Sequence, residues 1–425
     1  MDALAARHLS TYGYSRPTAP ALDRLANDGI VFTHAVAASC WTRPTIASLM
    51  TGRPVSDHRV EDRTTQLGAE LTTLAEVFHG AGRPTAAFVA NPVVRSEYGY
   101  DQGFDTYLDS DDLGQSTPAT GVLRHATAWV RDHAREDFLL FVFLTDVHDP
   151  YRAPPTHAGM FTSAPGDYPL QPPPEVARPF EPAIAGRIVA AYDESIRATF
   201  DEIGELFETL REVGAWDRAT VVVSADHGEM LGEHRSYRHL YQFWEPVLRI
   251  PLVVRSPAIA ARGVVEPRLV SQVDLMPTIL DVVGLQIPSE VRGHSLLPMW
   301  RDPLRGTNSS VVSEMSLFGV RRLAIRDDRY KVVVSHPVDA ARFLALTGNP
   351  STRLPRLPQG RVQVELYDLD ADPDEETDLA RGAVLPEPAT RLLATVPDAL
   401  HTPEADSAGR DEALLQDLRA LGYAN

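Results

Sequence analysis

Polar side chains follow directly after two apolar runs in the sequence. Asp226 and His227 come after residues 220–224 (TVVVS), and His148 comes shortly after residues 138–144 (FLLFVFL). Apolar runs of this kind are typical of strands that are buried on both faces of a parallel sheet. Ligands bind at the carboxyl edge of such strands in open α/β sheets. The sequence therefore predicts that these side chains share a binding site at one edge of a sheet.

A threonine hydroxyl lies at the predicted start of a helix. Thr42 and Arg43 lead into residues 44–51, which read as a helix that ends at Gly52. Pro44 fits the first helical turn, because the N–H that proline lacks is not needed there. The unpaired backbone N–H groups and the helix dipole at that end stabilise a bound oxyanion or an alkoxide. Thr42 is therefore a candidate reactive hydroxyl.

Each of these signals also has a purely structural explanation. Thr42 alone could be a helix N-cap, and Asp226 and His227 could form a turn with an Asx hydrogen bond. His148 could be a loop histidine whose ring nitrogens are satisfied locally. The polar stretch at residues 233–239 could be a solvated surface segment. The joint order of these residues along the chain is what favours a functional site.

Composition excludes several classes of protein. The 425 residues include 40 Lys and Arg against 58 Asp and Glu, which gives a net charge of −18. A nucleic-acid-binding protein needs a basic surface to displace counterions from phosphates, so nucleic acid is not an expected partner. The sequence has no run of about 18 apolar residues, and no membrane span is predicted. Cys40 is the only cysteine, which excludes an intrachain disulfide framework.

Apolar runs alternate with helical segments along most of the chain, which indicates an α/β sheet with helices on both faces. The apolar runs are residues 30–38, 85–89, 138–144, 220–224 and 251–254, and the longest predicted helix is residues 185–213. Short alternating stretches at residues 323–325, 331–334 and 364–367 predict a small antiparallel sheet. Residues 148–181 are dense in proline and are predicted to form an irregular loop, for example a lid over the site.

These patterns predict how the chain is divided. We expect a catalytic domain over residues 1–305, a small C-terminal subdomain over residues 306–400, and a tail over residues 401–425 that contains a surface helix. The first residues have neither a basic segment nor an apolar segment of the kind found in signal peptides, so a cytoplasmic location is expected. The sequence does not indicate the oligomeric state.

The ordered motifs resemble the sulfatase family of the alkaline phosphatase superfamily along nearly the whole chain. The most specific of them is SADHGEMLGEH at residues 224–234. The other matching segments are residues 2–4, 8–14, 20–25, 42–52, 148–151, 192–196, 251–255, 273–285, 292–299 and 365–375. The resemblance implies an alkaline-phosphatase-like three-layer sandwich with a mostly parallel central sheet, followed by a small antiparallel C-terminal subdomain.

Carried over residue by residue, the resemblance implies one divalent cation held by Asp2, Thr42, Asp226 and His227. Oxygen ligands with one imidazole suit Ca²⁺, Mn²⁺ or Zn²⁺. The cation lowers the pKa of the Thr42 hydroxyl and polarises the ester oxygen. Thr42 is then expected to attack phosphorus or sulfur in line and form a covalent intermediate that water clears.

The resemblance also implies residues that contact the substrate anion. His148 and His239 fall where the family places groups that touch the anion and protonate the leaving oxygen, and an imidazole titrates in the range that suits a general acid. Arg43 and Asn91 are further candidates for anion contacts. The expected partner is therefore a small anionic ester.

The sequence departs from the family at informative positions. Sulfatases proper oxidise a cysteine to formylglycine, but Thr42 occupies that position and Cys40 does not fit the oxidation signal, so no formylglycine is expected. Lys331, the only lysine, belongs to the C-terminal strand pattern and not to a pair of sulfate-binding lysines. The family's strand before its first aspartate has no counterpart in the sequence, so we expect Asp2 to lack that support.

These departures favour a metal-dependent hydrolase of anionic esters, either sulfates or, in preference, phosphates or phosphonates. One alternative is a phosphoryl head-group transferase. Another is a phosphodiesterase with two metals, in which His234 and His239 are extra ligands. A third is a degenerate member of the family that binds anions without turning them over.

Overall fold

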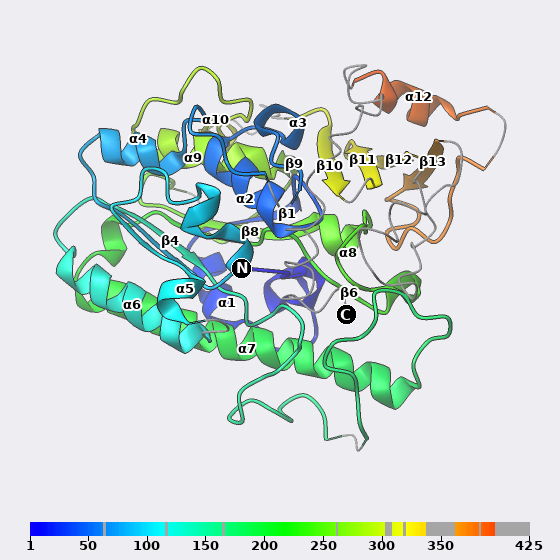
Figure 1. The fold of residues 1–425 in the computed structure, drawn as a ribbon, viewed down its shortest axis with the longest axis horizontal. Coiled ribbons are helices and arrows are strands. Elements are labelled where there is room, and N and C mark those ends of the chain that lie inside the picture. Colours follow the sequence, from blue (N-terminus) through cyan, green and yellow to red (C-terminus); the bar gives the residue numbers. More distant parts are fainter. Residues whose placement is uncertain are drawn as a thin grey trace.

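The computed structural model describes most of the chain. The described residues are 1–62, 65–114, 118–163, 166–260, 262–301, 308–317, 320–336, 362–381 and 384–395. They form a layered α/β body with a second, smaller sheet at one side (Figure 1). Among these residues, no helix is both long enough and apolar enough to cross a membrane. The predicted tail helix at residues 412–421 lies outside the described residues.

Two sheets lie in the main body. One has the strand order β5 (Val221–Ser224), β8 (Arg249–Arg255), β1 (Ile30–Val36) and β9 (Val264–Ser271). In it β8 runs antiparallel to both β5 and β1, and β1 runs parallel to β9. The other sheet is wholly parallel, with the order β3 (Thr106–Leu108), β2 (Thr85–Val89) and β4 (Leu139–Phe143).

Helices cover both faces of these sheets, as the sequence predicted. On one face lie α1 (Pro20–Asn27), α6 (Ala119–Asp132) and the long α7 (Pro182–Glu212), and on the other lie α2 (Thr42–Thr51), α4 (Leu74–Gly80) and α9 (Leu275–Val282) (Figure 1). An apolar core lies between each layer of helices and the sheets. One core packs α1, α6 and α7 against the sheets, and the other packs α2, α4 and α9 against β2 and β4. The three-layer prediction is confirmed.

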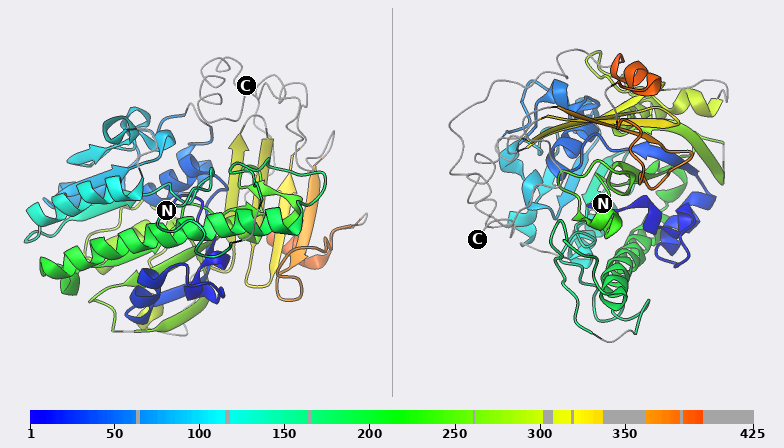
Figure 2. Two further views of the ribbon diagram at one scale, coloured as in Figure 1. Left: turned by 90° about the horizontal axis from the view of Figure 1, so that it is seen from below. Right: turned by 90° about the vertical axis from the view of Figure 1, so that its right-hand side faces the viewer.

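The C-terminal sheet is an antiparallel meander, also as predicted. Its strands are β10 (Val311–Leu317), β11 (Val320–Arg326), β12 (Tyr330–Ser335) and β13 (Gln363–Asp368), paired in that order. One face packs on α12 (Glu387–Leu393), and the other shares an apolar core with the main body around Trp41 and Phe243. Figure 2 shows the meander standing beside the main sheets.

Short elements complete the described chain. They are α3 (Val55–His58), α5 (Ser110–Leu113), α8 (Glu245–Leu248), α10 (Leu297–Arg301), β6 (Met230–Leu231) and β7 (Tyr237–Arg238). Short 3-10 helices are Ala6–His8, Ser10–Tyr12, Pro92–Val94, Ser96–Tyr98, Trp216–Arg218, Glu233–Arg235 and Gln272–Asp274. The described part of the proline-rich loop has no helix before Pro182, and its one bridge joins Glu175 to Ser236.

The start of the chain lies inside the molecule, between the two main sheets. The Met1 amino group donates to the Ser224 carbonyl oxygen at 3.1 Å, and the Asp2 N–H donates to the Leu144 carbonyl oxygen at 2.9 Å. The Asp226 N–H in turn donates to the Met1 carbonyl oxygen. Residues 1 and 2 therefore bridge the ends of β4 and β5. Behind them, the facing edges of these two strands line an apolar cavity of about 480 Å³.

Candidate active site

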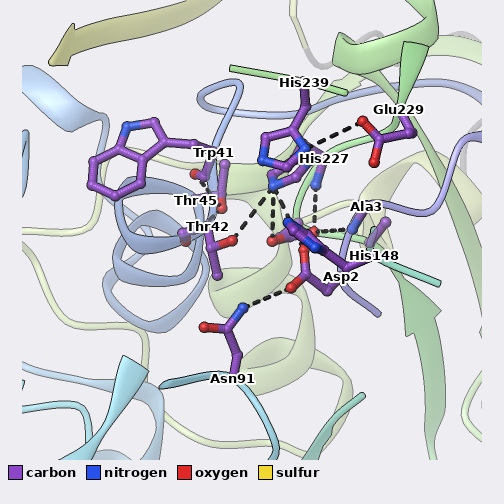
Figure 3. Close-up of polar contacts among 12 residues, drawn as sticks. Asp2, Ala3, Trp41, Thr42, Thr45, Asn91, His148, His227, Glu229 and His239 are labelled. Atoms are coloured by element: carbon purple, nitrogen blue, oxygen red, sulfur yellow. Dashed lines mark hydrogen bonds and ion pairs between the residues drawn. The ribbon is translucent and has the colours of Figure 1, made fainter. Parts of the chain in front are cut away.

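Four side chains from distant parts of the sequence meet beside the ends of β4 and β5. Figure 3 labels three of them, Asp2, Thr42 and His227. Asp2 comes from the bridge described above, Thr42 is the first residue of α2, and Asp226 and His227 follow β5. His227 Nε2 lies 3.2 Å from Asp226 Oδ2, 3.8 Å from Asp2 Oδ1 and 3.5 Å from Thr42 Oγ1. All four residues are buried.

The start of α2 explains how Thr42 reaches this point. The helix begins at Thr42, with Trp41 as its N-cap residue, and it ends at Gly52 in the left-handed conformation (φ +64°). Thr42 is thus not the N-cap, and the alternative structural explanation for it is wrong. Its hydroxyl lies at the positive end of the helix dipole, where backbone N–H groups have no partner within the helix.

The residues around this point fit a bound cation. Asp2 Oδ1 and Asp226 Oδ2 are buried and have no hydrogen-bond partner. His227 Nδ1 lies 2.9 Å from the Gly228 carbonyl oxygen, which can only accept, so Nδ1 carries the proton and Nε2 is left with its lone pair. One ligand atom from each residue lies within 4.8 Å of the other two. Carboxylate oxygens and an unprotonated imidazole nitrogen are the donors that Ca²⁺, Mn²⁺ and Zn²⁺ accept.

The buried Asp226 carboxylate is in an unfavourable state without such a charge. Burial is the main cause that raises the pKa of Asp226, His227 opposes it, and the negative charge of Asp2 adds to it, so the pKa reaches about 6. Hydrogen bonds nevertheless fix the orientation of both carboxylates, those of Asp2 and Asp226. Asp226 Oδ1 accepts from the backbone N–H groups of Ala3 and His227, at 3.1 and 2.7 Å. Asp2 Oδ2 accepts from Asn91 Nδ2 at 2.6 Å.

Asp2 is held by hydrogen bonds to neighbouring elements. Its backbone N–H is paired with β4, and the next residues are clamped by the buried Tyr192. The Tyr192 hydroxyl donates to the Ala3 carbonyl oxygen at 2.7 Å and accepts from the Ala5 N–H at 2.8 Å. Residues 1–5 form no strand, so these hydrogen bonds take the place of the strand support that Asp2 was expected to lack. Sequence reasoning missed the role of Tyr192, although it lies in the matching segment at residues 192–196.

Two further histidines border the cluster. The ring of His239 lies 4.1 Å from that of His227 and 5.1 Å from that of His148, between ring centroids. His148 Nδ1 donates to the Asp149 carbonyl oxygen at 2.7 Å. Burial alone would lower the pKa of His148, but the charges of Asp149, Asp2 and Glu229 outweigh burial and raise it to about 9. The structure thus brings both predicted histidines to the site.

Glu229 is a buried residue of this site that the sequence analysis did not single out. Its Oε1 lies 3.3 Å from His239 Nδ1, and the side chain is fully buried. Burial raises the pKa of this carboxyl well above its usual range. The available signal was its place within the SADHGEMLGEH motif, three residues after Asp226.

The other predicted anion contacts have protein partners. The Arg43 guanidinium is buried, stacks 4.2 Å from the centre of the Tyr98 ring, and donates to the Thr65 carbonyl oxygen. Asn91 donates to Asp2, as described, and its Oδ1 accepts from the Val93 N–H at 2.8 Å. In this arrangement Asn91 orients a carboxylate of the cluster. Direct contact of either residue with a substrate anion stays a prediction.

His234 lies apart from the candidate cation site. Its ring stacks on Trp244 with 4.2 Å between ring centroids. Within the described ranges, Asp2, Asp226 and His227 are the one group of acidic and histidine side chains placed to hold a metal ion. The alternative with two metals has no second cluster to support it there.

Comparison with known proteins gives matching families and relatives. Residues 1–285 match the family described as Sulfatase, and residues 232–351 match the C-terminal region of N-sulphoglucosamine sulphohydrolase. Arylsulfatase K of Rattus norvegicus is 31% identical over 188 residues, which cover 42% of this chain and 29% of that protein. Delta 4,5-hexuronate-2-O-sulfatase of Bacteroides thetaiotaomicron is 22% identical over 437 residues, covering 89% of this chain and 83% of that protein. The chain thus spans less than a third of the arylsulfatase and most of the second relative.

Solved structures share the fold. A protein in complex with its substrate D-glucosamine-2-N,6-O-disulfate has a TM-score of 0.76 and 18% identity, covering 94% of this chain and 96% of that chain. The phosphonate monoester hydrolase of Agrobacterium radiobacter has a TM-score of 0.72 and 20% identity, covering 94% and 93%. These likenesses establish the alkaline-phosphatase-like fold. Because the family match extends over more than half of the sequence, the chain belongs to the sulfatase family, a family of ester hydrolases.

Proposed function

We propose that the protein hydrolyses anionic esters of phosphorus or sulfur with Thr42 as the nucleophile. One observation carries the proposal. The Thr42 hydroxyl is buried at the first residue of α2, 3.5 Å from His227 Nε2 and beside two carboxylate oxygens that have no hydrogen-bond partner. A hydroxyl at this place is next to the groups that would hold a cation and next to the N–H groups that stabilise an oxyanion.

The residues have separable parts in this chemistry. Asp2, Asp226 and His227, with Thr42, would hold the cation, which when bound supplies a positive charge that favours the alkoxide and polarises the ester oxygen. Thr42 Oγ1, with its hydroxyl proton released to water, attacks phosphorus or sulfur, and the bond to the leaving oxygen breaks on the opposite side. His148 and His239 are the proton donors that flank the cluster, and either imidazole can later take a proton from the water that clears the intermediate.

The chemical type of the nucleophile favours phosphorus. A threonine forms a simple ester intermediate that water must attack at the central atom, whereas a formylglycine diol can expel its sulfate without such an attack. Cys40 is fully buried against Met315, and burial raises the pKa of its thiol to about 12. This environment gives the thiol no role in the reaction.

The charges at the site favour a substrate with a single negative charge. A divalent cation would balance the carboxylates of Asp2 and Asp226, and the Asp149 carboxylate, 3.4 Å from His148 Nδ1, favours a positive charge on that imidazole. Arg238 is paired with Asp149 at 3.4 Å. Since burying an unbalanced charge is costly, a phosphonate monoester, phosphodiester or sulfate ester fits better than a doubly charged phosphate monoester.

The test is an activity panel with one leaving group, 4-nitrophenol, carried on a phosphonate, a phosphodiester, a sulfate and a phosphate. We expect turnover of the singly charged esters in Ca²⁺, Mn²⁺ or Zn²⁺. Thr42→Ala should lose at least about 10³-fold in kcat, whereas Thr42→Ser should retain activity. Cys40→Ala is the matched control and should stay active. Full activity of Thr42→Ala, or a sulfatase activity that depends on Cys40, would contradict the proposal.

A further inference from the structure

Glu229 forms a buried pair with a histidine that borders the candidate cation site. Its Oε1 faces His239 Nδ1 at 3.3 Å, and both side chains are almost completely shielded from solvent. Figure 3 shows the Glu229 carboxylate beside the His239 ring, on the side away from Thr42. The other carboxylate oxygen, Oε2, has no hydrogen-bond partner. Glu229 therefore contacts the site through His239.

The backbone holds Glu229 in this place. The N–H groups of Gly228 and Glu229 donate to the carbonyl oxygens of Val247 and Pro246, at 2.7 and 3.1 Å. A Cβ atom at Gly228 would overlap the Pro246 carbonyl oxygen, so only glycine allows the loop after His227 to pack this closely on α8. The loop that carries two predicted cation ligands thus also fixes the carboxylate.

The pair determines which way His239 presents its nitrogens. A proton lies between Oε1 and Nδ1, whichever of these two atoms carries it, so Nδ1 is directed to Glu229. The His239 ring lies 4.1 Å from the His227 ring with 34° between their planes, and 5.1 Å from the His148 ring with 64° between their planes, so it stays beside a predicted cation ligand. His148 differs, because a backbone carbonyl oxygen, that of Asp149, holds its Nδ1. Glu229 is the orienting group that a substitution can remove.

We propose that Glu229 is a positioning residue that acts through His239, keeping a proton at Nε2 for the leaving oxygen. This inference rests on the proposed function. As the bond between phosphorus or sulfur and the leaving oxygen breaks, its electron pair stays on that oxygen, which takes the Nε2 proton. The Glu229–His239 pair has then lost the Nε2 proton and keeps only the proton between Oε1 and Nδ1. The negative charge that this leaves on the pair rests on the Glu229 carboxylate. Without the Glu229 carboxylate, the negative charge left by loss of the Nε2 proton would have to rest on the His239 ring itself.

The test is the dependence of rate on the leaving group. Glu229→Gln keeps the size of the side chain but cannot carry the negative charge that the pair acquires. Phenol is a poorer leaving group than 4-nitrophenol and needs the proton more. We expect Glu229→Gln to lose about 10²-fold in kcat on the phenyl ester and less than about tenfold on the 4-nitrophenyl ester. KM should change little for either ester.

Three comparisons make the result decisive. Glu314→Gln, a change at another buried glutamate whose pKa burial raises, should leave both rates unaltered. In a His239→Ala background, Glu229→Gln should have no further effect on the ratio of the two rates. Equal losses on both esters, or an unchanged ratio, would overturn the inference. Thr42→Ala is measured on the same esters, and its full activity would instead overturn the proposed function.

Discussion

Asp2 Oδ1 and Asp226 Oδ2 are buried oxygens without hydrogen-bond partners, and this arrangement makes the cation site testable apart from activity. A ligand that binds only the folded state stabilises it, by about 2.7 kcal/mol at one hundred times its Kd. We predict that Ca²⁺, Mn²⁺ or Zn²⁺ raises Tm in a thermal unfolding scan and that Asp226→Asn abolishes the rise. Asp111→Asn, at an exposed acid, is the control. An equal rise in all three proteins would contradict the site.

His58 is a residue whose protonation opposes folding. Its Nδ1 accepts from the Val60 N–H at 3.0 Å, so the proton sits on Nε2, which lies 2.9 Å from Ser48 Oγ on α2. Burial, the largest cause, lowers its pKa from 6.5 to about 3. Because the unfolded chain binds this proton more tightly, the stability from neutral His58 is complete above pH 6.5 and is lost as the pH falls toward 3.

This linkage has a measurable slope. Between about pH 6 and pH 4, His58 should contribute a loss of about 1.4 kcal/mol in the free energy of unfolding per pH unit. Denaturant unfolding at several pH values checks it. His58→Gln cannot be protonated, so its stability should fall less steeply over this range. Parallel pH profiles of the two proteins would show that His58 is not buried as described.

At the scale of elements, a cluster of buried charges joins the C-terminal sheet to the main body. Lys331 on β12 is fully buried, pairs with Glu245 at the start of α8 at 3.1 Å, and also pairs with Glu375. Arg326 on β11 binds the other oxygen of Glu245 at 2.7 Å. The only lysine of the sequence is thus engaged by two glutamates inside the protein.

Removing one partner of such a cluster leaves buried charges uncompensated. We predict that Lys331→Met lowers the free energy of unfolding by about 3–5 kcal/mol, measured in guanidinium chloride. Arg391→Met is the control within the same subdomain, because its pair with Asp327 is partly exposed and should contribute about 1 kcal/mol or less. Similar effects of the two substitutions would contradict the description of this interface.

The sequence predicted elements better than their pairing. The helices around residues 44–51 and 185–213 correspond to α2 and α7, since amphipathic spacing and the helix end at Gly52 are local features. The apolar run at residues 251–254 became β8, but it pairs antiparallel to its neighbours. Strand direction depends on which distant segments pair, and this is not encoded in the run itself.

The candidate site shows the same limit. The resemblance named the members of the cation cluster, and the structure brings them together. Glu229 and Tyr192 were not singled out, because their importance comes from contacts with His239 and with residues 3–5 that no local pattern reveals. Only the folded chain shows that Asn91 is engaged by Asp2.

At the scale of the whole molecule, the cavity between β4 and β5 separates two sheets whose edges face each other. Strand edges with free N–H and C=O groups pair readily with an added strand. An extension of five apolar β-branched residues on the amino side of Met1 should enter this cavity, slow the hydrogen exchange of residues 139–143 and 221–224, and raise Tm by about 2 °C or more. A Gly-Ser extension of equal length should do neither. If both extensions act alike, the cavity does not accept a strand.

The central claim, that the Thr42 hydroxyl is the nucleophile, can be tested directly by mass spectrometry. The protein is mixed with a 4-nitrophenyl phosphonate in the activating cation, quenched in acid within the first turnovers, and digested. The account predicts that the peptide containing Thr42 gains the mass of the phosphonyl group, that Thr42→Ala shows no gain, and that the peptide from Thr42→Ser gains the same group. A modified peptide elsewhere in the chain, or turnover by Thr42→Ala at the parent rate, would contradict it.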